Sequence, residues 1–298
     1  MIVNNVRMAA VVLLTSCLVV ACSFSCEVNS KPKLTLQEQL DKLAADASIL
    51  HEEEVASTIT TAASSTPNMR EISGEYCPEV EQKCLQWVDA LGAPTDAPKP
   101  GLTGRCGEFK NPSTCLTPEG SRPHKRFLID TYEYPNVAGQ VPQSWMTWRD
   151  VKRACESQGK RLCTRSEWTM ACEGPGMHPY PYGDGYHRDR TSCNTDNPVP
   201  KGVDVFKSKA PHDEMSTKLD AMLVPSGAKT ACVSVWGVHD QVGNIDEQLI
   251  NETGQPYKSG LMGGHVFGVR NACRPMTEAH NEDFGWYETG GRCCANVQ

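Results

Sequence analysis

Hydrophobic positions at the start of the chain are typical of an export signal. Arg7 is the only charged residue before an uncharged, mostly apolar stretch from Met8 to Ala21. Such a stretch is shorter than the roughly 20 apolar residues that a membrane-spanning helix needs, and it suits a signal-peptide core. It ends in 19–22 (VVAC), the pattern of a bacterial lipobox. We predict that residues 1–22 are a lipoprotein signal and that Cys22 carries the lipid. An uncleaved anchor helix and an ordinary signal peptide are the alternatives.

The next segment, residues 23–70, contains few residues that a core would bury. Leucines at helical spacing (Leu36, Leu40, Leu43) predict one short amphipathic helix. A polar run rich in Ser, Thr and Ala follows at 56–67, and such composition does not support a packed core. We therefore predict a largely disordered tether.

Later in the chain, hydrophobic runs alternate with helix-start signals. Residues 127–130 (FLID) predict a strand. Thr147 and Asp150 have capping-box spacing and predict the start of a helix, and Thr164 and Glu167 predict a second one. The 24 Gly and 20 Pro residues favour long loops between these elements. These signals predict a strand followed by two helices, with loops between them.

Cysteine usage changes this picture, because the chain has 15 Cys and no CxxC pair. Setting aside Cys17, Cys22 and Cys26 leaves twelve, an even number that suits disulfides in an oxidising compartment. Four of them fall in a Pro- and Gly-rich stretch that we predict to be a cysteine-bridged N-terminal elaboration, residues 71–125. These four, whose three possible connectivities stay open, are Cys77, Cys84, Cys106 and Cys115.

The charge balance excludes one class of partner. The net charge is −7 and the chain has no cluster of Lys and Arg. A nucleic-acid-binding surface needs such a basic patch. We expect no nucleic-acid partner.

Seven motifs in the remaining part, residues 126–298, resemble those of the formylglycine-generating enzyme (sulfatase-modifying factor) family. They occur in the family's order at 127–133, 148–155, 159–168, 180–183, 240–248, 262–265 and 291–293. The resemblance implies a disulfide-stapled, loop-rich α+β domain related to C-type lectins.

The resemblance also implies two disulfides, Cys155–Cys293 and Cys172–Cys273. The partners of Cys163, Cys193, Cys232 and Cys294 stay open. Loops this long should stabilise the fold by roughly 4 to 5 kcal/mol each in the chain-entropy model.

A structural calcium ion is a further implication of the family. Its ligands would be the side chains of Asp240 and Glu247 and the carbonyl oxygens of Gly243 and Ile245. Carboxylates and turn carbonyls suit Ca²⁺, which takes six to eight oxygens. A second calcium would use Asn194 and Thr195. A charged surface turn is the alternative for the first set.

The family's copper chemistry does not carry over to this sequence. Its oxidases bind Cu(I) through two cysteines, and Gly268 stands where the first would be, with no second one following. Because soft thiolates select Cu(I), we do not expect copper. The iron-binding helix motif of another branch is missing as well.

Four residues remain as candidates for a ligand cleft: His265, Arg270, Arg274 and His280. Arg guanidinium groups suit carboxylate, sulfate or phosphate ligands. His265, His280 and an acid would together form a metal site, and loop residues bonded to one another are the alternative.

Two classes of function follow. The first is a non-catalytic binding or assembly module, anchored by lipid to a bacterial envelope on the extracytoplasmic side and holding a peptide, glycan or anionic ligand. The second is an oxidoreductase or metal-dependent enzyme of altered chemistry.

Overall fold

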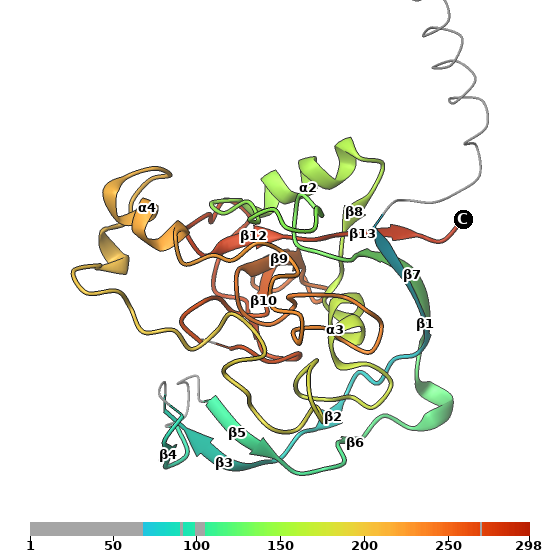
Figure 1. Cartoon of the computed structure of the whole chain (residues 1–298). Helices are drawn as coiled ribbons and strands as arrows, with labels where there is room; N and C mark the ends of the chain where they lie inside the picture. Colours follow the sequence, from blue (N-terminus) through green and yellow to red (C-terminus); the bar gives the residue numbers. More distant parts are fainter. Residues whose placement is uncertain (1–67, 90–91, 99–104, 269) are drawn as a thin grey trace, which may run out of the picture. The chain divides into compact units, whose positions relative to one another are not determined.

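The computed structural model describes residues 68–89, 92–98, 105–268 and 270–298, all within the unit Thr66–Gln298 (Figure 1). The predicted signal, Cys22 and nearly all of the predicted tether lie outside the described residues. Across the ranges given above, none of the helices has the length and apolar character needed to cross a bilayer.

The first of two main sheets has the strand order β1-β7-β13-β8. Its strands are β1 (Met69–Glu75), β7 (His124–Asp130), β13 (Cys293–Asn296) and β8 (Arg161–Leu162). β7 contains the predicted strand and buries Phe127 and Ile129, whose side chains share one face. β1 pairs with β7 along its whole length, from Met69 opposite Asp130 to Glu75 opposite His124. The main sheet thus takes its edge strand from the segment before residue 76.

Both predicted capping boxes are present and begin the two longest helices of the described residues. These are α2 (Trp148–Ser157) and α3 (Arg165–Glu173). In α2, the Thr147 hydroxyl accepts from the Asp150 backbone N–H, and the Asp150 carboxylate accepts from that of Thr147. Thr164 and Glu167 make the same reciprocal pair for α3. These bonds satisfy N–H groups that a helix start leaves without partners.

The second main sheet, of order β11-β10-β9-β12, lies at the centre of the molecule (Figure 1). Its strands are β9 (Asp246–Ile250), β10 (Ser259–Met262), β11 (Met276–Thr277) and β12 (Thr289–Gly291). β12 runs parallel to β9, with Thr289 opposite Asp246, whereas β10 is antiparallel to β9. A Cβ on Gly291 would lie 2.3 Å from a methyl group of Val151, so glycine allows α2 to pack directly on this strand.

The remaining elements are short and lie largely in the segment before β7 or in long loops. They are β2 (Val80–Glu81), β3 (Cys84–Val88), β4 (Pro94–Thr95), β5 (Arg105–Phe109), β6 (Thr114–Cys115), α4 (Glu214–Asp220) and the 3-10 turns η1 (Glu119–Ser121) and η2 (Val205–Lys207). β2 pairs with β6, and β3 pairs with β4 and β5. Such small sheets are marginal by themselves, so covalent links are needed to hold them.

Disulfides supply those links, and all twelve cysteines of the described residues are paired. The pairs are Cys77–Cys115, Cys84–Cys106, Cys155–Cys293, Cys163–Cys294, Cys172–Cys273 and Cys193–Cys232. The third and fifth are the pairs that the family resemblance implies. The architecture is thus the disulfide-stapled, loop-rich α+β fold that the sequence predicts.

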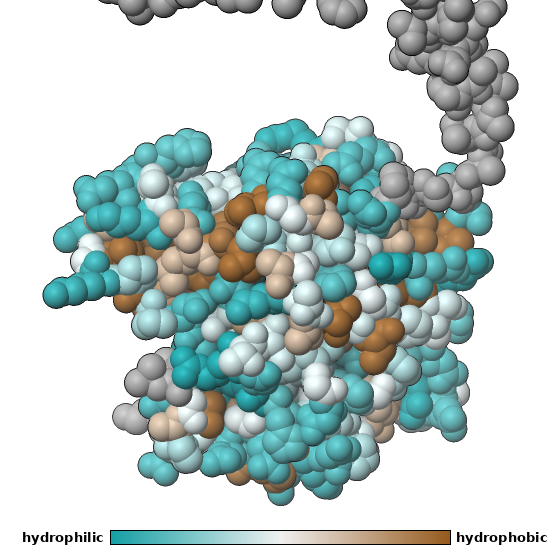
Figure 2. Space-filling view, viewed as in Figure 1, coloured by the Kyte–Doolittle hydropathy of each residue, from teal (hydrophilic) through white to brown (hydrophobic). Residues whose placement is uncertain are grey.

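On the face shown in Figure 2, hydrophobic residues of the coloured part of the chain occur in small, separate areas among hydrophilic ones. Large continuous apolar patches are the usual mark of a protein or membrane interface. The apolar residues on this face therefore do not mark such an interface.

Candidate functional site

The loop after β10 brings a histidine to the second main sheet. Gly263 and Gly264 have φ values of +94° and +68°, which glycine adopts without strain. A Cβ on Gly263 would lie 2.5 Å from the carbonyl oxygen of Gln241, so the close turn also needs the missing side chain. The turn directs His265 toward the residues at the start of β12, where its side chain is buried.

His265 lies within hydrogen-bonding distance of an acid that the sequence did not single out. Its Nε2 lies 2.9 Å from Oε2 of Glu288, and its Nδ1 accepts a long hydrogen bond from the Phe267 N–H. Glu288 is also bonded to the hydroxyl of Tyr287. Burial opposes ionisation of Glu288, but the hydrogen bond and charge of His265, together with Arg270, hold its pKa below the ordinary value.

An ion pair between Arg270 and Asp246 lies beside the contact of His265 with Glu288. Arg270 donates to Oδ2 of Asp246 over 2.7 Å, and the Gly264 N–H reaches the other carboxylate oxygen. Parallel pairing of β9 with β12 explains the proximity, because the Asp246 N–H donates to the Glu288 carbonyl oxygen. Burial raises the pKa of Asp246, and Arg270 opposes that rise. We call His265, Tyr287, Glu288, Asp246 and Arg270 the His265 cluster.

His280 lies next to this cluster. Its ring stacks on Phe284, with centroids 3.7 Å apart. Burial lowers its pKa, and the charges of Glu288, Arg270 and Asp246 act on it as well. Three of the four predicted cleft residues, His265, Arg270 and His280, therefore lie in one region.

Arg274, the fourth, does not share their contacts. Its guanidinium makes two bonds of 2.6 and 2.7 Å to the Glu173 carboxylate and further bonds to the carbonyl oxygens of Cys77 and Pro78. Burial raises the pKa of Glu173 to about 7, although Arg274 favours its ionised form. Arg274 belongs to a different pocket, described below.

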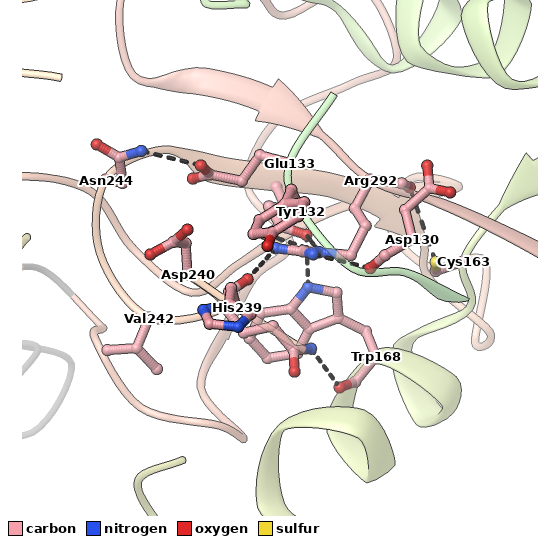
Figure 3. Close-up of polar contacts among 12 residues, drawn as sticks. Asp130, Tyr132, Glu133, Cys163, Trp168, His239, Asp240, Val242, Asn244 and Arg292 are labelled. Atoms are coloured by element: carbon pink, nitrogen blue, oxygen red, sulfur yellow. Dashed lines mark hydrogen bonds and ion pairs between the residues drawn. The ribbon is translucent and has the colours of Figure 1, made fainter. Parts of the chain in front are cut away.

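A buried charge network surrounds the predicted calcium turn (Figure 3). The Arg292 side chain is fully buried and donates to both oxygens of Glu247, at 2.9 to 3.2 Å. It also donates to the carbonyl oxygens of Asp130 and His239. The Trp168 indole N–H completes the network by donating to Glu247 over 2.8 Å.

Two further carboxyl groups lie near this pair. Asn244 donates to one oxygen of Glu133, and the other oxygen has no partner among the described residues. Burial and then the neighbouring charge of Asp240 raise the pKa of Glu133 well above its ordinary value. Burial raises the pKa of Asp240 to about 6, against a hydrogen bond from the Gly227 N–H. Three acids thus share one arginine in a buried place.

The predicted calcium ligands fit only in part. Glu247 is a poor ligand, because the guanidinium of Arg292 already occupies both of its oxygens. Asp240 is buried and forms no ion pair with a Lys or Arg among the described residues. Glu133 has one carboxylate oxygen available. Within the described residues, no group of three or more His, Cys, Asp and Glu side chains converges on a point that would hold a metal.

The predicted second calcium residues have structural contacts. The Asn194 side chain donates to Asn244 and to the Met222 carbonyl oxygen, and its own oxygen accepts from Asn197. Thr195 is buried, and its hydroxyl has no partner among the residues described. Asn194 therefore connects two loops through hydrogen bonds.

The position expected for the first copper cysteine has no room for a side chain. Gly268 has a φ of +74°, and a Cβ there would lie 1.9 Å from Oδ1 of Asp196. Arg188 holds that carboxylate with two bonds of 2.8 Å. A cysteine at 268 would require this buried ion pair to move.

Three residues of these clusters were not among the predicted site residues: Glu133, Glu288 and Arg292. Glu133 and Arg292 fall inside recognised motifs but were taken only as markers of the family. Glu288 follows two aromatic residues near the C-terminus, and no spacing rule connects it with His265. Only the sheet order β10-β9-β12 does so, because His265 follows β10 and Glu288 precedes β12.

Comparison with known proteins identifies the family. Residues 119–297 match the model of the "Sulfatase-modifying factor enzyme 1-like domain". Among solved structures, CarF is 13% identical, with 77% of this chain and 98% of that chain covered and a TM-score of 0.44. PvdO from Pseudomonas aeruginosa is 12% identical (76% and 94% covered, TM-score 0.39), and Treponema denticola variable protein 1 is 13% identical (77% and 95% covered, TM-score 0.39). No curated protein matches the chain. Since the family model covers more than half of its length, this protein belongs to the sulfatase-modifying factor family.

Proposed function

We propose that this protein is an extracytoplasmic lipoprotein whose sulfatase-modifying-factor-like domain binds a ligand or assembles with a partner without catalysing a reaction. The observation that carries the proposal is the pairing of all twelve cysteines in the described residues, which leaves no thiolate there for Cu(I) or thiol chemistry. Six disulfides also favour an oxidising compartment outside the cytoplasm.

The charges of the His265 cluster support a binding role. Each acid has its own partner, since Glu288 is hydrogen-bonded to His265 and Asp246 forms an ion pair with Arg270. Paired groups of this kind form a fixed polar surface, which suits recognition of a peptide, glycan or anionic ligand. Nucleophilic catalysis uses a base placed beside a free nucleophile. The five residues of the His265 cluster do not include such a pair.

Cysteine chemistry of the exported full chain tests this proposal. After alkylation without reduction, we expect peptide mass spectrometry to find no labelled cysteine in residues 68–298. Cu(I) titration against a competing chelator should show no stoichiometric binding. Metabolic labelling with a fatty acid should mark the wild type and not Cys22→Ala. Two labelled cysteines in the domain that also bind Cu(I) would refute the non-catalytic role, and unchanged lipid labelling of Cys22→Ala would refute the anchor.

One observation favours the second candidate, an enzyme of altered chemistry. A buried histidine held by a carboxylate is a common arrangement in general acid–base catalysis. Binding of a transition metal by the wild type, and its loss in His265→Ala, would support this candidate instead.

We also propose a structural calcium ion at Asp240, with Glu133 rather than Glu247 as the second acid. The excess of buried acids over Arg292 supports it, because a cation there would offset their repulsion. Calcium chloride should raise the Tm of the wild type more than magnesium chloride does, because Mg²⁺ keeps its waters more strongly. Asp240→Asn should remove the difference, and an equal shift in both proteins would contradict the site.

A further inference from the structure

A pocket lies at the start of α3, and none of its lining residues belongs to the His265 cluster. Its volume is about 360 Å³, toward the small end of the range for small-ligand sites. The lining comes from the end of β1, from β7, from the first turn of α3 and from the loops after β9 and Cys273. It consists of Tyr76, Pro78, Pro123, Lys125, Arg165, Ser166, Thr169, Glu252, Thr253 and Arg274. We call it the Tyr76 pocket.

Arg274 forms a rigid wall of this pocket. Four hydrogen bonds to Glu173, Cys77 and Pro78 hold its guanidinium in place. The disulfide from Cys172 to Cys273 fixes the residues next to both partners of the ion pair. A ligand would therefore meet a guanidinium that is already ordered, which lowers the entropy lost on binding.

Two more cations line the pocket without close partners. The Lys125 ammonium is 3.9 Å from the nearest oxygen of Glu252, and the Arg165 guanidinium is 3.8 Å from Glu278. Both distances exceed that of a hydrogen bond, so their donors remain available to a ligand. Lys125 and Arg274 lie on the Tyr76 ring, each 5.7 Å from its centroid, which keeps the cations near one another.

The pocket's only lining acid is already occupied. Both oxygens of Glu252 accept hydrogen bonds from Ser166, one from its backbone N–H at 2.7 Å and one from its hydroxyl at 2.8 Å. The start of α3 thus holds a carboxylate from within the chain, as helix N-termini favour. Because the nearest acids of Lys125 and Arg165 lie beyond hydrogen-bonding distance, the lining presents two cations that a ligand can bind directly.

We propose that the Tyr76 pocket binds a small ligand that carries one carboxylate or sulfate on a hydroxylated body of about the size of a monosaccharide. Lys125 and Arg165 would bind the oxyanion, with Arg274 behind them. The phenol of Tyr76 supplies a donor and an acceptor for a hydroxyl group, and Pro78 and Pro123 supply apolar contact. This site is independent of the His265 cluster and goes beyond the function proposed above.

Calorimetric titration of the full chain tests the proposal with four probes: glucuronate, glucose 6-sulfate, glucose and inorganic sulfate. We expect the two charged sugars to bind and to weaken as salt is added, and we expect glucose and inorganic sulfate to bind at least tenfold more weakly. Lys125→Gln and Arg165→Gln should each weaken binding of the charged sugars by about tenfold, the effect of one lost charge-assisted hydrogen bond. Arg126→Gln is the matched control, because Arg126 is the next residue on β7, is exposed and pairs with Glu71. Its affinity should equal that of the wild type.

Four results would overturn the proposal. The first is that neither charged sugar binds at millimolar concentration, and the second is that glucose binds as well as glucuronate. The third is that inorganic sulfate alone matches glucose 6-sulfate, which would mean that the sugar body contributes nothing. The fourth is equal affinity in Lys125→Gln, Arg165→Gln and the wild type. Binding of only one of the two charged sugars supports the site and identifies the oxyanion. The thiol and copper results do not affect any of these outcomes.

Discussion

Replacing Arg292 with Met is expected to lower the free energy of unfolding by about 3–5 kcal/mol, the range observed when one partner of a buried ion pair is removed. The Arg292 side chain is fully buried and bonds both oxygens of Glu247. Without the guanidinium, Glu247 would be an uncompensated buried charge close to Glu133 and Asp240. Urea unfolding monitored by tryptophan fluorescence measures the change, since Trp168 donates to Glu247.

Two further variants separate charge from packing. In Arg292→Met with Glu247→Gln, the glutamine still accepts from Trp168 and the unpaired charge is gone. We therefore expect the double variant to be more stable than the sum of the two single changes implies. Arg126→Met breaks an exposed pair with Glu71, of length 2.7 Å, and should cost less than about 1 kcal/mol. A loss for Arg292→Met no larger than that of Arg126→Met would contradict the role given to the buried network.

The second large effect concerns the vicinal cysteines of β13. Cys293 pairs with Cys155 of α2 and Cys294 pairs with Cys163, so two bridges close almost the same loop, with separations of 138 and 131 residues. While one bridge is intact, the other closes only a ring of about ten residues. In the chain-entropy model the second bridge then contributes about 3 kcal/mol. Either bridge alone closes a ring of roughly 40 residues, because the Cys172–Cys273 bridge inside the loop stays intact, and contributes about 4 kcal/mol.

We therefore expect that the losses in the free energy of unfolding do not add when the two disulfides are replaced by pairs of alanines. Removing Cys155 and Cys293, or Cys163 and Cys294, should each lower the free energy of unfolding by about 3 kcal/mol, and removing all four should lower it by about 7 kcal/mol. Urea unfolding of the three variants measures these losses. The wild type reduced in denaturant shows the stability that remains when no disulfide is present. Losses for the two single removals that add up to the loss for the fourfold variant would contradict the shared-loop explanation.

The local elements and the family could be predicted because their signals lie close together in sequence. Thr147 with Asp150 and Thr164 with Glu167 marked the starts of α2 and α3, since a capping box involves residues only three positions apart. The family was recognisable because short motifs preserve their own spacing. The even number of cysteines likewise indicated a stapled fold before any partner was known.

The arrangement of site residues could not be obtained this way. Arg274 and His265 were predicted to line one cleft, yet Arg274 bonds Glu173 and residues after β1 instead. Glu288 reaches His265 because β9 pairs with both β10 and β12, which no local pattern indicates. The Tyr76 pocket combines five separate parts of the chain, and none of them carries a recognisable binding motif.

The sequence by itself therefore determined the class of fold, the family, the helix starts and the use of cysteines in disulfides. Each of these depends on composition or on residues a few positions apart. Only the tertiary structure decided which partner each buried acid has: Glu247 has Arg292, Glu288 has His265 and Glu173 has Arg274. The physical reason is that a buried charge takes whichever partner the packing of distant strands brings within hydrogen-bonding distance.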